Sequence, residues 1–121
     1  KGRPTVVPCA EALENKSYSK KFQKGFTGTA GGFYGPQGRV VRLNIQDPQL
    51  NSKMDAFNYN GTRMTNLEME TSAIYGLGKL LGHNCLSLNA IIANRAVGEF
   101  SSKPEETVNE LIKYTLDKLV E

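Results

Sequence analysis

Two carboxylates with one residue between them are the first feature of the sequence that could do chemistry. Glu68 and Glu70 flank Met69, and the small residues that begin at position 71 indicate the start of a helix. If residues 66–70 close a strand, both carboxylates point to one face and Met69 points to the other. If the helix already begins at Glu68, the carboxylates diverge by about two hundred degrees. A carboxylate at a helix N-terminus is stabilised by the helix dipole without any ligand, so the motif is consistent with capping or with binding.

A glycine-rich loop carries a second candidate set. Residues 28–39 read GTAGGFYGPQGR, and within them Phe33, Gln37 and Arg39 are the side chains suited to recognition. The glycine spacing matches neither GxGxxG nor a P-loop, so it does not predict a phosphate cradle. Glycine at this density lets the backbone turn sharply or approach a ligand closely, although an ordinary loop between strands has a similar composition.

The end of an apolar run is a third candidate position. Residues 85–93 are almost continuously apolar, as in a strand buried between helix layers, and Asn94 and Arg95 follow directly. Polar groups at the carboxyl end of a strand are common ligand contacts in open α/β sheets. We therefore expect Asn94 and Arg95 to face a ligand.

Length and composition narrow the class of protein. With 121 residues and a mass of 13.3 kDa, the chain forms one domain at most. Its 15 basic and 12 acidic residues are scattered without a basic block, which argues against nucleic-acid binding. No apolar run has the length of a membrane span and no signal peptide is visible, so we expect a soluble, cytoplasmic protein without a membrane partner. The only histidine, His83, and the two cysteines, Cys9 and Cys85, match no metal or redox spacing, so we expect structural roles for them and no metal site.

The order of strand-like and helix-like segments predicts an α/β fold. The expected strands are residues 4–8 (as the end of a strand), 22–29, 40–45 and 85–93, and residues 11–24 are expected to be part helix and part loop. Asn60 and Gly61 give the clearest turn signal. Gly76 and Gly78 lie inside a predicted helix, where glycine costs stability, so we expect close packing against another element there.

Three helices are expected after residue 46. The first starts with Asp47 as N-cap and Pro48 in its first turn. The second ends at Gly82. The third starts with a capping box from Ser102 to Glu105. The residues predicted to share one face are Leu50, Met54 and Phe57 in the first helix, Ala73, Ile74, Leu77, Leu80 and Leu81 in the second, and Val108, Leu111, Ile112, Thr115, Leu116 and Leu119 in the third.

Three segments taken together resemble one enzyme family. In chain order they are residues 33–39 (FYGPQGR), 66–70 (NLEME) and 90–95 (AIIANR). In this order and at this spacing, the chain resembles the C-terminal half of a uridine phosphorylase, a member of the nucleoside phosphorylase superfamily. The resemblance implies a three-layer αβα fold with a mixed central sheet, of which residues 1–121 form the C-terminal portion without an internal domain boundary. It also implies a homo-oligomer, either a dimer or a hexamer built as a trimer of dimers.

The resemblance assigns roles to particular residues. Arg95 and Glu70 are implied as catalytic residues. Phe33 would stack on the pyrimidine ring, and Gln37 and Arg39 would read its edge. Glu70 would accept hydrogen bonds from the ribose 2′- and 3′-hydroxyls. The full substrate-binding set implied by the family is Phe33, Gln37, Arg39, Glu68, Met69, Glu70, Ile92 and Ala93.

The implied reaction is the reversible phosphorolysis of uridine to uracil and ribose 1-phosphate. It needs inorganic phosphate as co-substrate and no cofactor, so the expected partners are a small-molecule nucleoside and phosphate. Uracil presents an acceptor–donor–acceptor edge, and Gln37 can donate and accept whereas Arg39 only donates. Negative charge gathers on the departing base as the glycosidic bond breaks, so cations near the base help most in the transition state.

The resemblance also bears on the choice of base. Purine-specific relatives place an aspartate, which can protonate N7, near the end of the strand that here ends in Asn94 and Arg95. Asparagine cannot donate that proton, so a pyrimidine is favoured. Two departures put strict selectivity for uracil over thymine in question: Gly38 stands where some bacterial uridine phosphorylases carry a glutamate, and Ala93 stands where valine is common.

The phosphate-binding part of the family's site has no counterpart in this sequence. In the family that part lies in the N-terminal half, and residues 1–32 contain nothing similar. The sequence therefore predicts a nucleoside half-site without a phosphate half-site. Three alternatives stay open: a non-catalytic domain that binds a nucleoside or nucleobase, a purine nucleoside phosphorylase or nucleosidase relative, and a scaffold that has kept the fold and lost its ligand.

Overall fold

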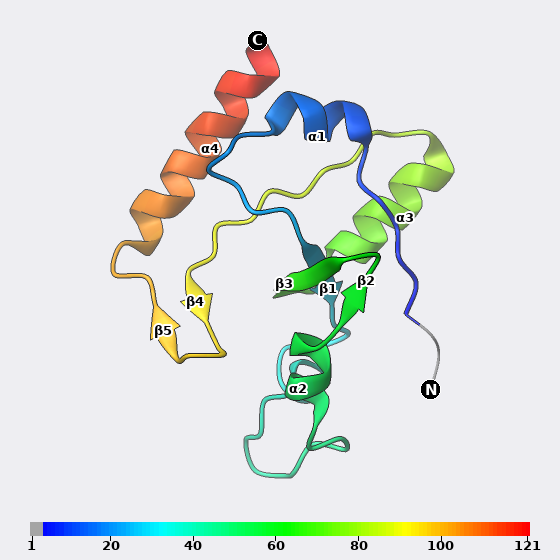
Figure 1. Ribbon diagram of the computed structural model, residues 1–121, viewed down its shortest axis with the longest axis vertical. Coiled ribbons are helices and arrows are strands. Elements are labelled where there is room, and N and C mark those ends of the chain that lie inside the picture. Colours follow the sequence, from blue (N-terminus) through cyan, green and yellow to red (C-terminus); the bar gives the residue numbers. More distant parts are fainter. Residues whose placement is uncertain (1–3) are drawn as a thin grey trace.

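The chain combines short strands with helices of one to five turns (Figure 1). The computed structural model describes residues 4–121. In chain order the elements are α1 (Glu11–Ser17), β1 (Phe26–Thr29), the 3-10 helix η1 (Gly35–Gln37), α2 (Leu50–Asp55), β2 (Asn58–Tyr59), β3 (Thr62–Glu68), α3 (Thr71–Leu81), β4 (Ala93–Asn94), β5 (Glu99–Phe100) and α4 (Pro104–Val120).

A mixed sheet with the order β1-β3-β2 lies at the centre of the chain. β1 and β3 are parallel, with Thr29 opposite Glu68, and β2 is antiparallel to β3. Because the pair is parallel, the loops that follow β1 and β3 leave the sheet at the same edge. This arrangement confirms the predicted α/β class with a mixed sheet, and it places the glycine-rich loop and the two-carboxylate motif together.

The turn between β2 and β3 forms where the sequence predicts it. Asn60 and Gly61 both have positive φ values, 51° and 82°. Those are the angles that a two-residue hairpin turn requires and that asparagine and glycine tolerate. The Asn58 side chain accepts a hydrogen bond from the Gly61 N–H at 2.9 Å.

α3 begins directly after Glu70 and ends as predicted at Gly82, whose φ is 77°. The His83 N–H donates to the Gly78 carbonyl at 2.7 Å and the Gly82 N–H donates to the Lys79 carbonyl, which is the Schellman pattern. A Cβ on Gly78 would lie 2.3 Å from Cys85 Sγ, so the predicted close packing is confirmed there. It is wrong for Gly76, where a Cβ would meet nothing within 4 Å.

Long-range contacts connect the N-terminal segment with α4, among them a hydrogen bond from Lys16 Nζ to the Leu119 carbonyl at 3.2 Å. α1 lies beside the C-terminal part of α4 (Figure 1), where Tyr114 donates to the Ser17 carbonyl at 3.0 Å. The ring of Phe22 packs edge-on against Tyr114 at 4.9 Å between centroids. Residues 11–17 form α1 and residues 18–24 are irregular, so the prediction of part helix and part loop for residues 11–24 is confirmed.

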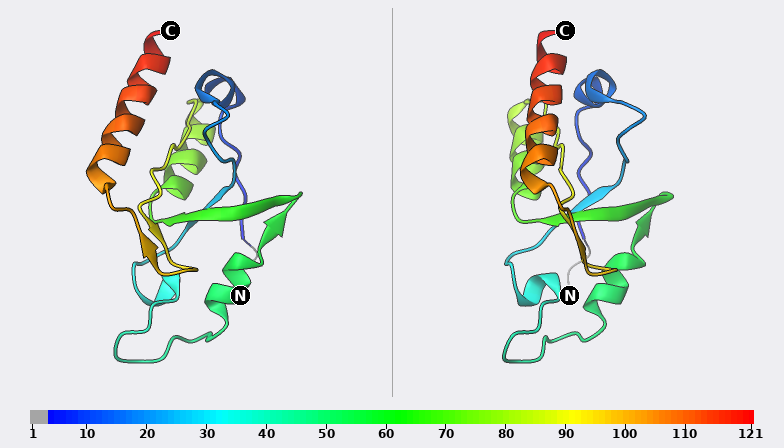
Figure 2. Two further views of the ribbon diagram at one scale, coloured as in Figure 1. Left: turned by 60° about the vertical axis from the view of Figure 1, so that its left-hand side comes forward. Right: turned by 90° about the vertical axis from the view of Figure 1, so that its left-hand side faces the viewer.

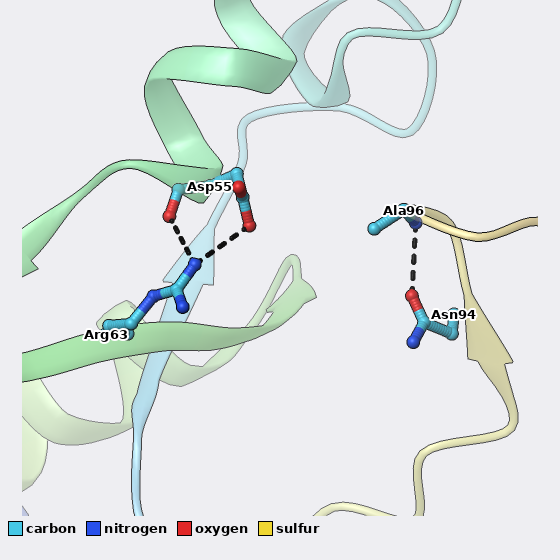
Figure 3. A network of polar contacts seen from close by, with 4 residues as sticks. All are labelled: Asp55, Arg63, Asn94 and Ala96. Carbon is cyan, nitrogen blue, oxygen red and sulfur yellow. Dashed lines mark hydrogen bonds and ion pairs between the residues drawn. The ribbon is translucent and has the colours of Figure 1, made fainter.

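α2 is joined to β3 by an exposed polar contact. Arg63 Nη2 donates to the Asp55 carbonyl at 3.2 Å and lies 3.3 Å from its carboxylate (Figure 3). An exposed pair of this kind contributes at most about 1 kcal/mol to stability. The edge-on packing of Phe26 against Phe57 at 6.0 Å and against Tyr59 at 5.8 Å adds apolar contacts to the same junction.

Three predicted strands are not formed within the described residues. Residues 4–8, 40–45 and 85–92 are irregular, and only Ala93 of the third prediction belongs to a strand. The prediction for residues 22–29 was too long, because β1 covers only Phe26–Thr29. A strand needs a ladder of hydrogen bonds to the backbone of a neighbour, and the described residues give these segments no ladder: in 85–92 only the Cys85 and Ile92 carbonyls accept from a backbone N–H.

Two predicted helix starts are also wrong. α2 has Gln49 as its N-cap, and Asp47 instead closes the preceding turn by accepting from the Gln49 N–H at 3.1 Å. α4 has Lys103 as its N-cap without a side-chain hydrogen bond, so the capping box from Ser102 is not formed, although Pro104 does lie in the first turn. Short polar side chains compete with the helix start by capping local turns.

Candidate functional site

The junction of β3 and α3 is held by the Glu68 carboxylate. Its Oε1 accepts a hydrogen bond from the Thr29 hydroxyl at 2.5 Å. Its Oε2 accepts from the N–H groups of Glu70 at 2.5 Å and Thr71 at 2.6 Å. The Thr29 hydroxyl in turn accepts from the Ser72 N–H at 3.0 Å. Glu68 and Thr29 together therefore satisfy three N–H groups at the start of α3 and connect the ends of β1 and β3.

The electrostatics of this junction favour an ionised Glu68. Partial burial acts most strongly and would raise the pKa of Glu68, but the hydrogen bonds from Thr29 and from the backbone of Glu70 and Thr71 together outweigh it, so the pKa is lowered. A carboxylate is also favourable at the positive end of the helix dipole. Both oxygens of Glu68 are used inside the chain, which gives Glu68 a positioning role for the residues that follow it.

Glu70 is placed differently from Glu68. It is exposed and serves as the N-cap residue of α3 through its backbone, without a side-chain capping bond. Its Oε2 accepts from the Met69 N–H at 3.0 Å, and its Oε1 accepts nothing from residues 4–121. The Met69 side chain is 44% exposed. Of the two carboxylates, Glu70 therefore has the larger acceptor capacity left for a ligand.

The loop after β1 brings Phe33, Gln37 and Arg39 together. Arg39 Nη1 donates to the Gln37 side-chain oxygen at 2.6 Å and to the Phe33 carbonyl at 2.5 Å. Its guanidinium lies 3.8 Å from the centre of the Phe33 ring, in a cation–π contact. Gln37 is only 4% exposed. The three residues predicted to recognise a base are therefore one contacting cluster.

The geometry of this cluster restricts what it can bind. One face of the Phe33 ring is covered by Arg39, and the Tyr34 ring packs at right angles to it with 5.2 Å between centroids, so a planar ligand would have to stack on the face away from Arg39. The Gln37 oxygen already accepts one hydrogen bond, which leaves it one lone pair. The Gln37 amide nitrogen donates to nothing in residues 4–121 and can serve as a donor. A planar group with alternating acceptors and donors fits these positions.

Gly38 has a conformational reason to be glycine. Its φ is 74°, and a Cβ at this position would lie 2.1 Å from the Asn51 side chain, which donates to the Gly38 carbonyl at 3.2 Å. An L side chain in this conformation is strained. The departure from the family pattern at Gly38 thus follows from the way α2 closes against this loop.

Arg95 lies on the hairpin formed by β4 and β5, which comes close to the cyan segment that contains η1 in the two views of Figure 2. Partial desolvation and the positive charge of Arg39 both lower the pKa of Arg95, so the two guanidinium groups lie within electrostatic reach of each other. An arginine stays charged regardless. Neither arginine forms an ion pair within the described part of the chain. The pair is a cationic spot suited to a ligand on which negative charge develops.

Asn94 has a local structural role. Its side-chain oxygen accepts from the Ala96 N–H at 3.1 Å and closes the hairpin turn (Figure 3). Ala93 pairs with Phe100, and Ile92 accepts from the Ser101 N–H at 2.9 Å through its carbonyl. The side chain of Ile92 is 44% exposed. The structure places both residues at the base of the hairpin without enclosing a pocket around them.

Two hollows on the described surface do not coincide with the predicted site. A depression of about 330 Å³ is lined by residues 104–109 of α4, and another of about 210 Å³ is lined by residues of the 38–51 segment. Neither is lined by a predicted site residue. Residues 4–121 also contain no group of three metal-ligating side chains, and no helix among them is long and apolar enough to cross a membrane.

Thr29 is the residue of this region that sequence reasoning missed. Nothing marks it in the sequence except its place at the end of a predicted strand. Its importance depends on the parallel pairing that sets it opposite Glu68, 39 residues away. A rule that looked for hydroxyl groups at the ends of strands next to an acidic helix start would have selected it.

Comparison with solved structures identifies the fold of the chain. No protein-family model matches the sequence, and no curated protein matches it. Among solved structures, the chain is similar to a nucleoside phosphorylase from Trypanosoma brucei that shows uridine phosphorylase activity, with a TM-score of 0.78 and 24% sequence identity. The match covers 94% of this chain and 42% of that chain. The chain therefore has the fold of part of a nucleoside phosphorylase and spans less than half the length of that protein.

Proposed function

We propose that this chain carries the base- and ribose-binding half of a pyrimidine nucleoside phosphorylase site, for the reversible phosphorolysis of uridine. One observation carries the proposal. At the carboxyl edge of the parallel β1–β3 pair, the segment after β3 carries an acceptor carboxylate and the loop after the adjacent strand β1 carries an aromatic–amide–guanidinium cluster. Such an edge is where open α/β sheets bind ligands. The likeness to a nucleoside phosphorylase supports the same reading at the level of the fold.

The base would be recognised by the cluster on the loop after β1. Uracil would stack on the uncovered face of Phe33, and the Gln37 amide would donate to a carbonyl and accept from N3–H. Arg39 and Arg95 would stabilise the charge that gathers on the base as it leaves. Two cations without a carboxylate partner among the described residues suit that task, because no fixed negative charge competes with the base.

The ribose would be held by the turn between β3 and α3. Glu70 would accept from the 2′- and 3′-hydroxyls with its Oε1 and with the remaining lone pair of Oε2. Its negative charge would gain strength as the sugar becomes positive during bond cleavage. Met69 would contact the sugar, and Glu68 with Thr29 would hold the turn in place.

The proposal requires inorganic phosphate as co-substrate and no other cofactor. The phosphate site would come from polypeptide other than these residues, in a homo-oligomer of cytoplasmic location. A non-catalytic nucleoside-binding domain is the second candidate, because no phosphate-binding motif of the family is present in the sequence. The purine alternative is disfavoured by Asn94, whose side chain closes a turn and cannot protonate N7.

The test is uracil release from uridine by the native protein, followed by chromatography with and without inorganic phosphate. We expect release that depends on phosphate and a much lower rate with inosine. We also expect that residues 1–121 alone show no phosphorolysis, because positioning a nucleophile can be worth roughly 7–11 kcal/mol of the barrier. Uridine binding without phosphate-dependent release in the native protein would favour the non-catalytic candidate. A preference for inosine would refute the pyrimidine assignment.

A further inference from the structure

The turn that carries Gln37 and Arg39 is tied to α2 by one hydrogen-bonding side chain. Inside residues 34–39, the N–H groups of the last three residues donate to carbonyl groups at the start of the turn, at 2.9–3.0 Å. The residues that follow the turn are irregular as far as α2. Among the hydrogen bonds of residues 4–121, the one that joins this turn to a later element runs from Asn51 Nδ2 to the Gly38 carbonyl at 3.2 Å.

Asn51 and Gly38 fit each other closely. A Cβ at position 38 would lie 2.1 Å from Asn51 Oδ1, so the Asn51 side chain occupies space that only a glycine leaves open. Because a peptide unit is planar, the hydrogen bond that fixes the Gly38 carbonyl also fixes the peptide plane that leads into Arg39. Gln37 directly precedes Gly38. Asn51 thus acts on the backbone between the two side chains assigned to the base.

α2 connects this contact with the central sheet. Asn51 and Asp55 are four residues apart in α2 and therefore lie on the same side of the helix. Asp55 contacts Arg63 of β3 at 3.2 and 3.3 Å (Figure 3). The same strand leads into the turn that carries Glu70. β3 therefore supports the proposed ribose-binding turn directly and the turn with Gln37 through α2.

The orientation of the Gln37 amide decides which pyrimidine edge it can match. Arg39 donates to the Gln37 side-chain oxygen at 2.6 Å, and because a guanidinium only donates, this contact holds the oxygen of the amide toward Arg39. Uracil offers a carbonyl acceptor next to an N3–H donor, whereas cytosine offers an amino donor next to an N3 acceptor. An amide held in one orientation discriminates between these edges. An amide that is free to turn by half a rotation does not.

We propose that Asn51 is a positioning residue for base recognition. It holds the turn so that Arg39 stays on the Gln37 oxygen and the amide keeps the orientation that selects uracil over cytosine. The inference rests on the proposed function and deepens it by naming a residue that sets the base specificity of the same site. Asn51 is exposed on α2 and lies outside the substrate-binding set expected from the sequence.

The test is Asn51→Leu in the full-length native protein, with Asn44→Leu as the matched control. Leucine has about the size of asparagine, lacks the donor and is a good helix former. Asn44 lines the same surface hollow as Asn51 but forms no hydrogen bond with residues 4–121. Calorimetric titration with uracil and with cytosine gives the ratio of the two affinities. We expect Asn51→Leu to lower the preference for uracil by about threefold to tenfold, as for the loss of one hydrogen bond, and Asn44→Leu to leave it unchanged.

Two further readouts separate positioning from general destabilisation. Amide exchange at Arg39, whose N–H donates to the Tyr34 carbonyl, should become faster in Asn51→Leu by about threefold to tenfold, while exchange in the middle of α4 stays unchanged. The ratio of kcat/KM for uridine over 2′-deoxyuridine, which reports on the sugar, should also stay constant. An unchanged preference for uracil, or equal effects of the two variants, overturns the inference.

The outcomes distinguish this inference from the proposed function. Phosphate-dependent uracil release by an Asn51→Leu protein that keeps the wild-type base preference overturns the inference alone. Uracil binding whose selectivity depends on Asn51, in a native protein that releases no uracil from uridine, refutes the proposed function alone. A wild-type protein that binds no uracil overturns both.

Discussion

Replacing Glu68 by glutamine should weaken the start of α3 by about 1–2 kcal/mol. The carboxylate accepts three hydrogen bonds, from the Thr29 hydroxyl and from the N–H groups of Glu70 and Thr71. Glutamine has one acceptor oxygen with two lone pairs. That oxygen can keep the two backbone N–H groups, but the Thr29 hydroxyl then faces an NH₂ group and loses its acceptor.

The magnitude follows from two losses. One hydrogen bond contributes about 0.5–1.5 kcal/mol net, and a negative charge at a helix N-terminus contributes about 0.3–1 kcal/mol. Because Glu68 is partly exposed, solvent screens the charge, and the lower part of the sum applies. A loss of about 1–2 kcal/mol corresponds to a change of roughly 5–30-fold in a local opening equilibrium.

The assay is amide exchange at Thr71 and Ser72 in the native assembly, with an amide in the middle of α4 as internal control. Thr29→Val should give a similar loss, because it removes the donor to Glu68 and the acceptor for the Ser72 N–H. Thr29→Ser keeps the hydroxyl and should restore most of the protection. The Glu68→Gln/Thr29→Val double variant should lose less than the sum of the single variants, since both act on one network. Additive losses, or unchanged exchange at Thr71, would refute the network.

The same network should make stability depend on pH in a defined direction. The pKa of Glu68 is lowered in the folded protein, so its stabilising effect is complete above the unfolded value of about 4.3. The effect is lost as pH falls through the lower folded pKa. Urea unfolding should therefore separate wild type from Glu68→Gln fully at pH 7, and the difference should begin to shrink below about pH 4.3 and disappear once the pH is below the lowered folded pKa. A difference that stays constant down to pH 2 would contradict ionisation of Glu68 as the cause.

Three further predictions concern other positions. Gly78→Ala should destabilise the protein by about 1–3 kcal/mol in thermal unfolding, because the new Cβ would lie 2.3 Å from Cys85 Sγ. Gly76→Ala should be neutral or stabilising by up to about 1 kcal/mol, because a Cβ there meets nothing within 4 Å. Arg39→Ala in the native enzyme should lower kcat/KM for uridine by roughly 10–100-fold, from the loss of charged hydrogen bonds worth about 1.5–3 kcal/mol; unchanged kinetics would remove Arg39 from the site. Glu70→Gln should cost about 3 kcal/mol in kcat/KM, mostly in kcat, and less on 2′-deoxyuridine; normal kinetics with a lowered melting temperature would leave Glu70 as a helix-start residue only.

Features that depend on a few neighbouring residues were predictable from the sequence. The turn at Asn60 and Gly61 follows from the φ angles those residues tolerate. The end of α3 at Gly82 follows in the same way, from a left-handed C-terminal residue. The cluster of Phe33, Gln37 and Arg39 also lies within one short loop, so its members could meet without help from the rest of the chain.

Features that depend on a distant backbone were not predictable. Thr29 gains its role only because β1 pairs in parallel with β3 and brings it to Glu68. Residues 40–45 alternate as a strand does, yet Val40, Val41 and Leu43 are 59%, 68% and 84% exposed, and nothing in residues 4–121 pairs with them. Alternation indicates which side chains favour burial, but it carries no information on which strand supplies the hydrogen bonds.

The segment from 85 to 93 shows why such an error is informative. Its composition is that of a strand buried on both faces, but in the structure only Ala93 belongs to a strand, and in residues 85–92 only the Cys85 and Ile92 carbonyls accept from a backbone N–H. Composition reflects the surroundings in which a sequence is stable, whereas pairing reflects the neighbours that are present. The strand prediction for residues 85–93 was therefore wrong at the step from composition to pairing, since of this segment only Ala93 pairs with another strand among residues 4–121.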